Sequence, residues 1–189
     1  MSASLEQSRY QVIHSAAELA DVAGGETLQP YLDRYYRHVA TEDVLARSPE
    51  DLLGAALSHK ELAANRPVGT ANVRVFTPTV QEEGWSCGHT VIEIVTDDMP
   101  FLVDSVSSYL THQGHAIHLI IHPVIAISRE IAGSLGEVLD DDAGTVVGDP
   151  EVTVGSWMHL KIDRDTAISG GERMCGAMQA TSSVALPLR

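Results

Sequence analysis

A strand that leads through a tight turn into an amphipathic helix is the feature that most constrains how this chain can fold. Residues 90–96 (TVIEIVT) are rich in β-branched side chains, which suit a packed pleated surface, so this run predicts a central strand. The turn Asp97-Asp98-Met99-Pro100 then offers acidic groups and an early proline, and Asp98 is the expected cap of the next helix. That helix should end before Gly114 and bury a stripe of Leu102, Val106, Tyr109 and Leu110.

Two further β-rich segments follow. Residues 116–129 predict a strand with an edge or bulge at Pro123, because proline cannot donate a ladder hydrogen bond. One face of this strand is expected to carry Ile117, Leu119 and Ile121. Residues 157–162 (WMHLKI) alternate and predict a third strand, whose inward face consists of Met158, Leu160 and Ile162.

The segment 131–151 between these strands is glycine-rich and acidic. It holds four glycines together with Asp140, Asp141, Asp142 and Asp149, which is typical of a solvated connection. The acidic triplet lacks the alternating ligands of a calcium loop, so a solvated loop is the preferred interpretation.

The N-terminal third has a helical rather than a twofold period. Residues from about 10 to 65 are expected to be mostly helical, with one amphipathic helix at 27–40. Ser48-Pro49-Glu50-Asp51 combines a capping hydroxyl, a proline and carboxylates, and so predicts a second helix start. Its buried face would be formed by Leu52, Leu53, Ala56 and Leu57. Residues 65–69 (NRPVG) break this pattern, and Val73–Thr77 predicts a short strand after them.

Size and charge exclude several classes of function. A chain of 189 residues is too short for a dehydrogenase with separate nucleotide and substrate domains, and its net charge of −14 disfavours nucleic-acid and membrane-surface partners. The apolar stretch 116–127 is too short to cross a bilayer, and no secretory signal opens the chain, so we expect a cytoplasmic location. Cys87 and Cys175 are expected to be free thiols.

Several segments, taken in order, carry a resemblance to one family. Residues 98–103, with Leu110, Gly114 and Ile117, have the spacing of the ACT-domain signature. The wider set consists of Tyr35-Tyr36-Arg37-His38-Val39, Asp51-Leu52-Leu53-Gly54-Ala55-Ala56, Val73-Arg74-Val75-Phe76-Thr77-Pro78, Gly84-Trp85, Thr96–Val106, His122-Pro123-Val124 and Ser156-Trp157-Met158-His159. Together they resemble the N-terminal region of large bacterial NAD-specific glutamate dehydrogenases, from about residue 10 to Asp165.

The resemblance implies a fold and a division of the chain. The fold class is α+β, with a helical N-terminal segment and an incomplete ACT sheet of the ferredoxin-like βαββαβ type. The expected parts are a helical segment at 1–66, an ACT-like domain with a leading strand at 67–165, and a poorly ordered tail at 166–189. That tail would lack the second helix and fourth strand, which would leave an unpaired sheet edge. A truncation or a shifted reading frame near Asp165 would explain this ending.

The resemblance also implies a role in glutamate catabolism. The whole enzyme would oxidise L-glutamate to 2-oxoglutarate and ammonia while reducing NAD, but its catalytic region is absent here, so no catalytic residue is assigned. The chain has no Gly-x-Gly-x-x-Gly fingerprint, and neither of its two lysines, Lys60 and Lys161, lies in a substrate motif. This chain would therefore bind no cofactor. Its implied partners are the remainder of the dehydrogenase, other copies of it in a homo-oligomer, and an amino-acid effector.

The effector would bind at the turn after the first ACT strand, because exposed amides at a helix start favour a carboxylate. The candidate residues are Asp97, Asp98, Met99, Pro100 and Phe101. Phe101 departs from the family, which usually has glycine there. Two other functions stay open, namely a stand-alone amino-acid sensor and a truncated product without an independent role.

Other chemistry receives less support. The histidines His112, His115, His118 and His122 straddle a helix end, a turn and a strand, so their spacing implies no common metal site. Cys87-Gly88-His89 pairs a thiol with an imidazole but lacks a third orienting group, so no nucleophile is assigned. We therefore assign no metal site to this chain.

Overall fold

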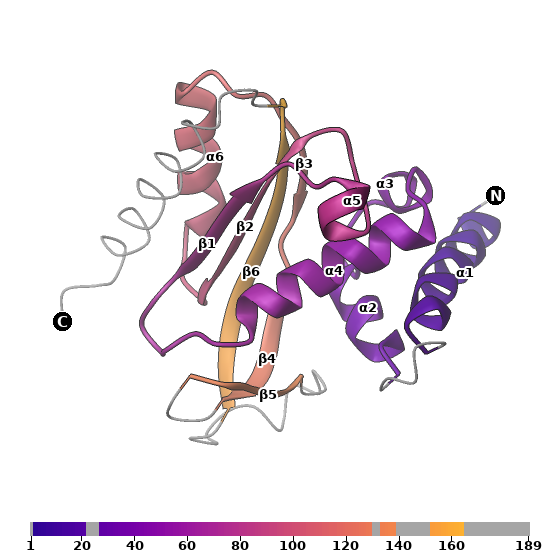
Figure 1. Cartoon of the computed structure of the whole chain (residues 1–189), viewed down its shortest axis with the longest axis horizontal. Coiled ribbons are helices and arrows are strands. Elements are labelled where there is room, and N and C mark those ends of the chain that lie inside the picture. Colours follow the sequence, from indigo (N-terminus) through magenta and orange to yellow (C-terminus); the bar gives the residue numbers. More distant parts are fainter. Residues whose placement is uncertain (1, 22–26, 130–132, 139–151, 165–189) are drawn as a thin grey trace.

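The computed structural model describes residues 2–21, 27–129, 133–138 and 152–164 (Figure 1). The helices are α1 (Ser2–Asp21), α2 (Gln29–Tyr35), α3 (Thr41–Leu45), α4 (Pro49–Ala63), α5 (Val80–Glu83) and α6 (Leu102–His112). The strands are β1 (Asn72–Phe76), β2 (Thr90–Asp97), β3 (Ile117–Ile121), β4 (Val124–Arg129), β5 (Leu135–Val138) and β6 (Val152–Ile162). This confirms the α+β class. None of the described helices is both long and apolar enough to cross a membrane.

The strands form one six-stranded sheet in the order β1-β2-β6-β4-β5, and β3 also pairs with β6. Every pairing is antiparallel. Because β3 pairs with residues 159–162 of β6 and β4 with residues 152–156, the two strands are halves of one strand, interrupted at His122-Pro123. The break expected at Pro123 is therefore present.

β1 occupies the outer edge of β2, from the Asn72–Val95 pair to the Phe76–Val91 pair. β2 is consequently an interior strand, as the sequence predicts. The pairing of β1 with β2 thus extends the sheet beyond the strand that opens the ACT-like unit. A strand that precedes the unit in sequence provides this pairing. The predicted unpaired edge depends on the tail at 166–189, which lies outside the described residues.

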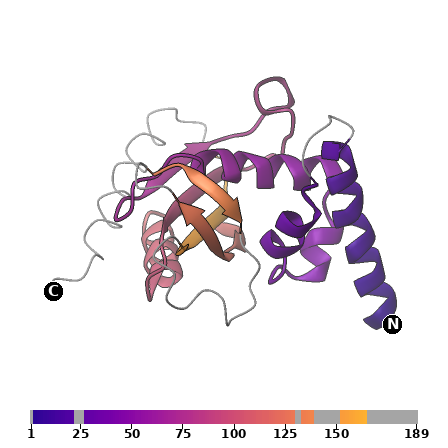
Figure 2. The same cartoon turned by 90° about the horizontal axis from the view of Figure 1, so that it is seen from below.

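The sheet is packed on both faces (Figures 1 and 2). On one face, α6 contributes Leu102, Val106 and Leu110 to a hydrophobic cluster with inward residues of β2 and β6. On the other, α1 to α4 form a larger cluster with β2, β3, β4 and β6. Trp157 lies in the cluster with α1 to α4, and Met158 lies in the cluster with α6. The middle of β6 is therefore buried on both faces.

Helix α4 begins as predicted but buries a different face. Ser48 caps it by accepting a hydrogen bond from the Asp51 N–H at 3.2 Å. Leu52 is fully buried, but Leu57 is 39% exposed, so its assignment to the buried face was wrong. The polar side chains Ser58 and His59 take buried positions on α4 instead.

The helix expected at 27–40 is shorter than predicted and ends at Tyr35. Tyr35 and Tyr36 are both 1% exposed, and the Tyr36 N–H still donates to the Leu32 carbonyl at 3.0 Å. Tyr36 Oη donates to the Leu52 carbonyl and Tyr31 Oη to the Ala56 carbonyl, each at 2.7 Å.

Helix α1 starts at Ser2, well before residue 10, where helix was expected to begin.

The face assigned to residues 116–129 was partly wrong. The register of β3 against β6 shifts between Ile117 and Leu119, so Ile117 packs with α6 whereas Leu119 and Ile121 face α1 to α4. Strand β5 lies in the segment that was expected to be a plain connection. The acidic triplet at 140–142 and the tail at 166–189 lie outside the described residues.

Candidate functional site

The turn between β2 and α6 carries the five candidate effector residues. Asp97 forms an ion pair with Arg66 at 2.5 Å and accepts a hydrogen bond from the Gly69 N–H at 2.8 Å. The Arg66 side chain is fully buried, so Asp97 compensates a buried charge and ties the α4–β1 connection to β2. Its carboxylate is therefore committed to a structural contact.

Asp98 does not cap α6, contrary to the prediction. Its exposed carboxylate accepts a hydrogen bond from Ser156 Oγ at 2.7 Å, and Ser156 Oγ lies 3.2 Å from His122 Nε2. Because the serine donates to Asp98, it accepts from His122 Nε2–H. A serine nucleophile needs the imidazole between hydroxyl and carboxylate. The order here is different, so this chain of hydrogen bonds positions Asp98 and is not a catalytic triad.

Phe101 is the residue at the N-cap of α6. It has φ of 64°, the left-handed region, and it is 76% exposed. No side chain caps α6, so its first amides keep their capacity to bind an anion. Met99 packs against the α6 cluster, and Pro100 is exposed. Glycine fits this conformation without strain, and phenylalanine adopts it at a cost.

We expect Phe101→Gly to stabilise the chain by about 1 kcal/mol, because glycine has no Cβ to strain in the left-handed region. Phe101→Ala is the matched control, since it removes the ring but keeps the Cβ, and it should leave stability nearly unchanged. Urea unfolding of the three chains measures the difference. Equal stabilities of the glycine and alanine variants would contradict the backbone explanation.

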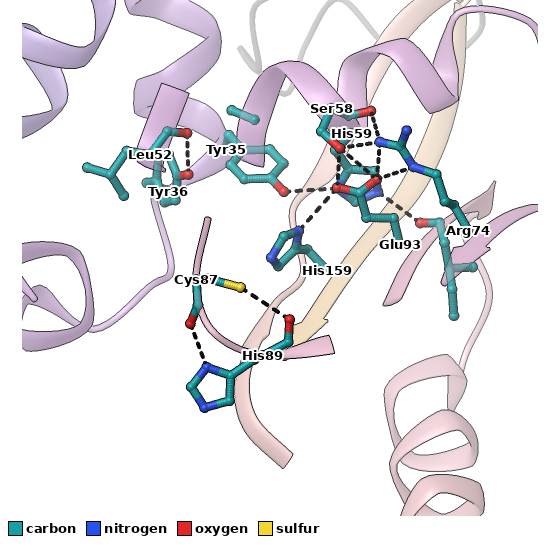
Figure 3. Close-up of polar contacts among 12 residues, drawn as sticks. Tyr35, Tyr36, Leu52, Ser58, His59, Arg74, Cys87, His89, Glu93 and His159 are labelled. Atoms are coloured by element: carbon teal, nitrogen blue, oxygen red, sulfur yellow. Dashed lines mark hydrogen bonds and ion pairs between the residues drawn. The ribbon is translucent and has the colours of Figure 1, made fainter. Parts of the chain in front are cut away.

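A buried polar cluster between α4 and the sheet was missed by the sequence analysis. Its centre is formed by His59 from α4, Glu93 from β2 and His159 from β6, all 0% exposed; we call it the His-Glu-His cluster (Figure 3). Arg74 binds Glu93 Oε2 at 2.9 Å, and Ser58 Oγ donates to the same carboxylate at 3.0 and 3.1 Å. The sequence signal that could have revealed this cluster is Glu93, a glutamate inside the otherwise apolar run of β2.

The two histidines differ in how they are satisfied. His59 Nδ1 lies 2.9 Å from Tyr35 Oη, and its Nε2 lies 3.1 Å from the Ile94 carbonyl oxygen. Since a carbonyl only accepts, Nε2 carries the proton and Nδ1 accepts from the tyrosine. His159 Nδ1 lies 3.4 Å from Glu93 Oε1, and neither of its ring nitrogens has a hydrogen-bond partner among the described residues.

Burial and charge shift the pKa values of this cluster in opposite directions. Burial lowers the pKa of His59 to about 4 and also lowers that of His159, so both rings are neutral near pH 7. Burial raises the pKa of Glu93, but its contacts with His159, His59 and Arg74 outweigh this and lower it to about 2. The cluster therefore holds one carboxylate, one guanidinium and two neutral imidazoles.

Acid should destabilise the chain through this cluster. A histidine with a lowered folded pKa stabilises the fold above its unfolded pKa, and this contribution is lost as the pH falls from 6.5 towards about 4. For His59 the loss is on the order of 3 kcal/mol. We expect the free energy of unfolding, measured in EDTA, to fall between pH 7 and pH 4. His159→Phe should show a smaller fall, whereas the exposed control His112→Gln should match the parent chain; identical slopes in all three would contradict this.

A pocket of about 160 Å³ lies between the end of α2 and the break between β3 and β4. It is lined by Arg34, Arg37, His38, His122, Pro123 and Val124. Hydrogen bonds connect its lining residue His122 to Ser156, and Ser156 to Asp98 in the β2–α6 turn. Burial lowers the pKa of His122, and the nearby Asp98 carboxylate opposes this.

The other histidines considered from the sequence do not converge. His118 pairs with Asp163 at 2.7 Å, and His112 lies 2.7 Å from the Ser108 carbonyl on its own helix. The ring of His89 is tilted against that of His118 with the ring centroids 4.7 Å apart, and His89 Nδ1 contacts the carbonyl of Cys87. Within the described ranges, only His59, Glu93 and His159 have the geometry of a metal-ligand group.

Comparison with known proteins identifies the family. The NAD-specific glutamate dehydrogenase of Pseudomonas aeruginosa is 31% identical over 134 residues, which cover 71% of this chain and 8% of that protein. The enzyme of the same name from Halomonas elongata is 38% identical over 96 residues, covering 51% and 6%. No solved structure matches the chain.

The match to a family extends over most of the sequence. Residues 31–173 match the ACT1 domain of glutamate dehydrogenase. The expected end of the resemblance at Asp165 was therefore placed too early. This chain belongs to the glutamate dehydrogenase ACT1 domain family.

Proposed function

We propose that this chain is the N-terminal regulatory and structural region of an NAD-dependent glutamate dehydrogenase. The observation that carries the proposal is the match of residues 31–173 to the ACT1 domain. In addition, the parts of the two relatives that align with this chain are only 8% and 6% of the length of those proteins. In the full enzyme, glutamate oxidation and NAD reduction belong to a separate catalytic region. We further propose that this enzyme is cytoplasmic and homo-oligomeric.

The regulatory part of the proposal rests on the β2–α6 turn as an amino-acid site. The uncapped start of α6 offers amide donors and the positive end of the helix dipole to a carboxylate. The exposed carboxylate of Asp98 offers a counter-charge to an ammonium group. Asp97 shapes this turn through Arg66, and Met99, Pro100 and Phe101 form the backbone that a ligand would approach.

Calorimetric titration of the chain with the twenty amino acids tests this site. We expect one class of amino acid to bind, and Asp98→Asn to weaken it about tenfold through the lost charge-assisted contact. Glu82→Gln, a change of an exposed carboxylate on α5, is the control and should bind as the parent chain does. Absence of binding by all twenty would refute the effector site at this turn.

A second experiment tests the place of the chain in the larger enzyme. The catalytic region of a relative, produced separately, should bind this chain. Adding the chain should also change how the reaction rate of that catalytic region depends on glutamate concentration. An effector response without any such interaction would instead favour a stand-alone sensor.

The chain alone should not form NADH from glutamate and NAD. The full sequence contains no Gly-x-Gly-x-x-Gly fingerprint that would let a backbone approach the pyrophosphate of the dinucleotide. Absorbance of the purified chain with both substrates measures this. Glutamate-dependent NADH formation that copurifies with the chain through successive columns would overturn the assignment.

A further inference from the structure

The two ring nitrogens of His159 are buried polar atoms whose hydrogen-bonding capacity the described residues leave unused. The side chain is 0% exposed, and among the described residues neither Nδ1 nor Nε2 has a hydrogen-bond partner. A neutral imidazole has one donor and one acceptor, and burying them unpaired costs roughly 1–3 kcal/mol. Buried groups of this kind are satisfied in nearly all proteins, by protein atoms, water or an ion.

The neighbours of His159 supply the rest of a ligand set. The ligand atoms of His59, Glu93 and His159 all lie within 4.8 Å of one another. His159 Nδ1 and Glu93 Oε1 are 3.4 Å apart. A tetrahedral ion with bonds of about 2.0–2.1 Å separates its ligand atoms by roughly 3.3–3.4 Å. One edge of such a tetrahedron is therefore already formed.

The surrounding contacts hold these ligands in the required orientation. His59 Nε2–H donates to the Ile94 carbonyl, so Nδ1 carries the lone pair that could bind an ion. This is the usual support for a metal-binding imidazole. Arg74 holds Glu93 by Oε2, while Oε1 faces His159 Nδ1, so the carboxylate would lie between the guanidinium and the ion. Binding of an ion through His59 Nδ1 would displace the hydrogen bond that Tyr35 Oη donates to this atom at 2.9 Å.

We propose that His59, Glu93 and His159 bind one divalent transition-metal ion of the zinc type. Two imidazoles and one carboxylate form a donor set that suits zinc, and full burial is typical of a closed structural site. The ion would give His159 a partner and join α4 to β2 and β6. It would thus fix the helical segment to the sheet.

Zinc titration of the full chain after chelator treatment tests the site. We expect one zinc ion per chain in competition with a chromogenic chelator, a higher melting temperature with zinc, and visible absorption typical of tetrahedral coordination when cobalt replaces zinc. A chain that binds no zinc, or gives only an octahedral cobalt spectrum, refutes the proposal without any variant.

Two variants locate the ion. His159→Phe keeps an aromatic ring of similar size and should weaken zinc binding at least about 100-fold, because it removes a direct ligand. His118→Gln removes the exposed imidazole that lies near His89 and Asp163, and it should bind zinc like the parent chain. Circular dichroism confirms that each variant is folded. Zinc affinity that survives in folded His159→Phe but disappears in His118→Gln would place the ion at the surface and overturn the proposal.

Discussion

Val106→Asp should leave the chain without a cooperative thermal transition at 25 °C or above. Val106 is 4% exposed and lies in the cluster between α6 and the sheet. The substitution removes about 1.5–3 kcal/mol of apolar burial and adds several kcal/mol for an unpaired buried carboxylate. Because a domain of this size is stable by only about 5–15 kcal/mol, we expect the ACT-like unit to unfold.

The control for this prediction lies one residue away on the same helix. Ser105 is exposed, so Ser105→Asp adds the same charge in the first turn of α6 without burying it. It should change the free energy of unfolding by less than about 0.5 kcal/mol. Circular dichroism and thermal melts report on both variants. An unchanged melt of Val106→Asp, or of the equivalent Leu102→Asp, would show that this face of α6 is not buried.

The parts of the fold that the sequence predicted are those set by local pattern. The strand at 90–96, the helix that ends before Gly114 and the Ser48 cap of α4 each depend on neighbouring residues only. Side-chain period and capping chemistry act over a few residues, so they can be read without the tertiary structure. The family resemblance supplied the α+β class.

The parts that were missed depend on long-range contacts. Ser58 and Glu93 are 35 residues apart in sequence, and nothing near either residue indicates that they share a buried contact. Asp98 shows the same effect, because its partner Ser156 lies 58 residues away and draws it from the capping role that its position suggested. Within the candidate site, local reasoning thus found the turn but neither the partners of its acids nor the buried cluster.

Arg74→Met should destabilise the chain by about 3–5 kcal/mol at pH 7, because it leaves the Glu93 carboxylate buried without its cationic partner. The Glu93 side chain is 0% exposed, whereas that of Arg74 is 28% exposed, so the cost falls on the glutamate. Loss of Arg74 raises the folded pKa of Glu93 from about 2 towards its unfolded value, because Arg74 is one of the contacts that lower it. A carboxylate with a lowered folded pKa stabilises the fold above its unfolded pKa, so the difference between the parent chain and the variant should shrink as the pH falls from about 4.5 towards 2.

Glu93→Gln in the Arg74→Met background should restore part of the lost stability. Glutamine keeps the shape of the side chain and still accepts from Ser58, but it carries no charge that needs compensation. Urea unfolding of the parent chain, both single variants and the double variant, all in EDTA, gives the coupling energy between the two residues. We expect it to exceed about 1.5 kcal/mol, since direct contacts between buried ionised groups couple strongly. Additive effects of the two substitutions would mean that Arg74 does not compensate Glu93, and that the charge of the buried cluster is balanced in another way.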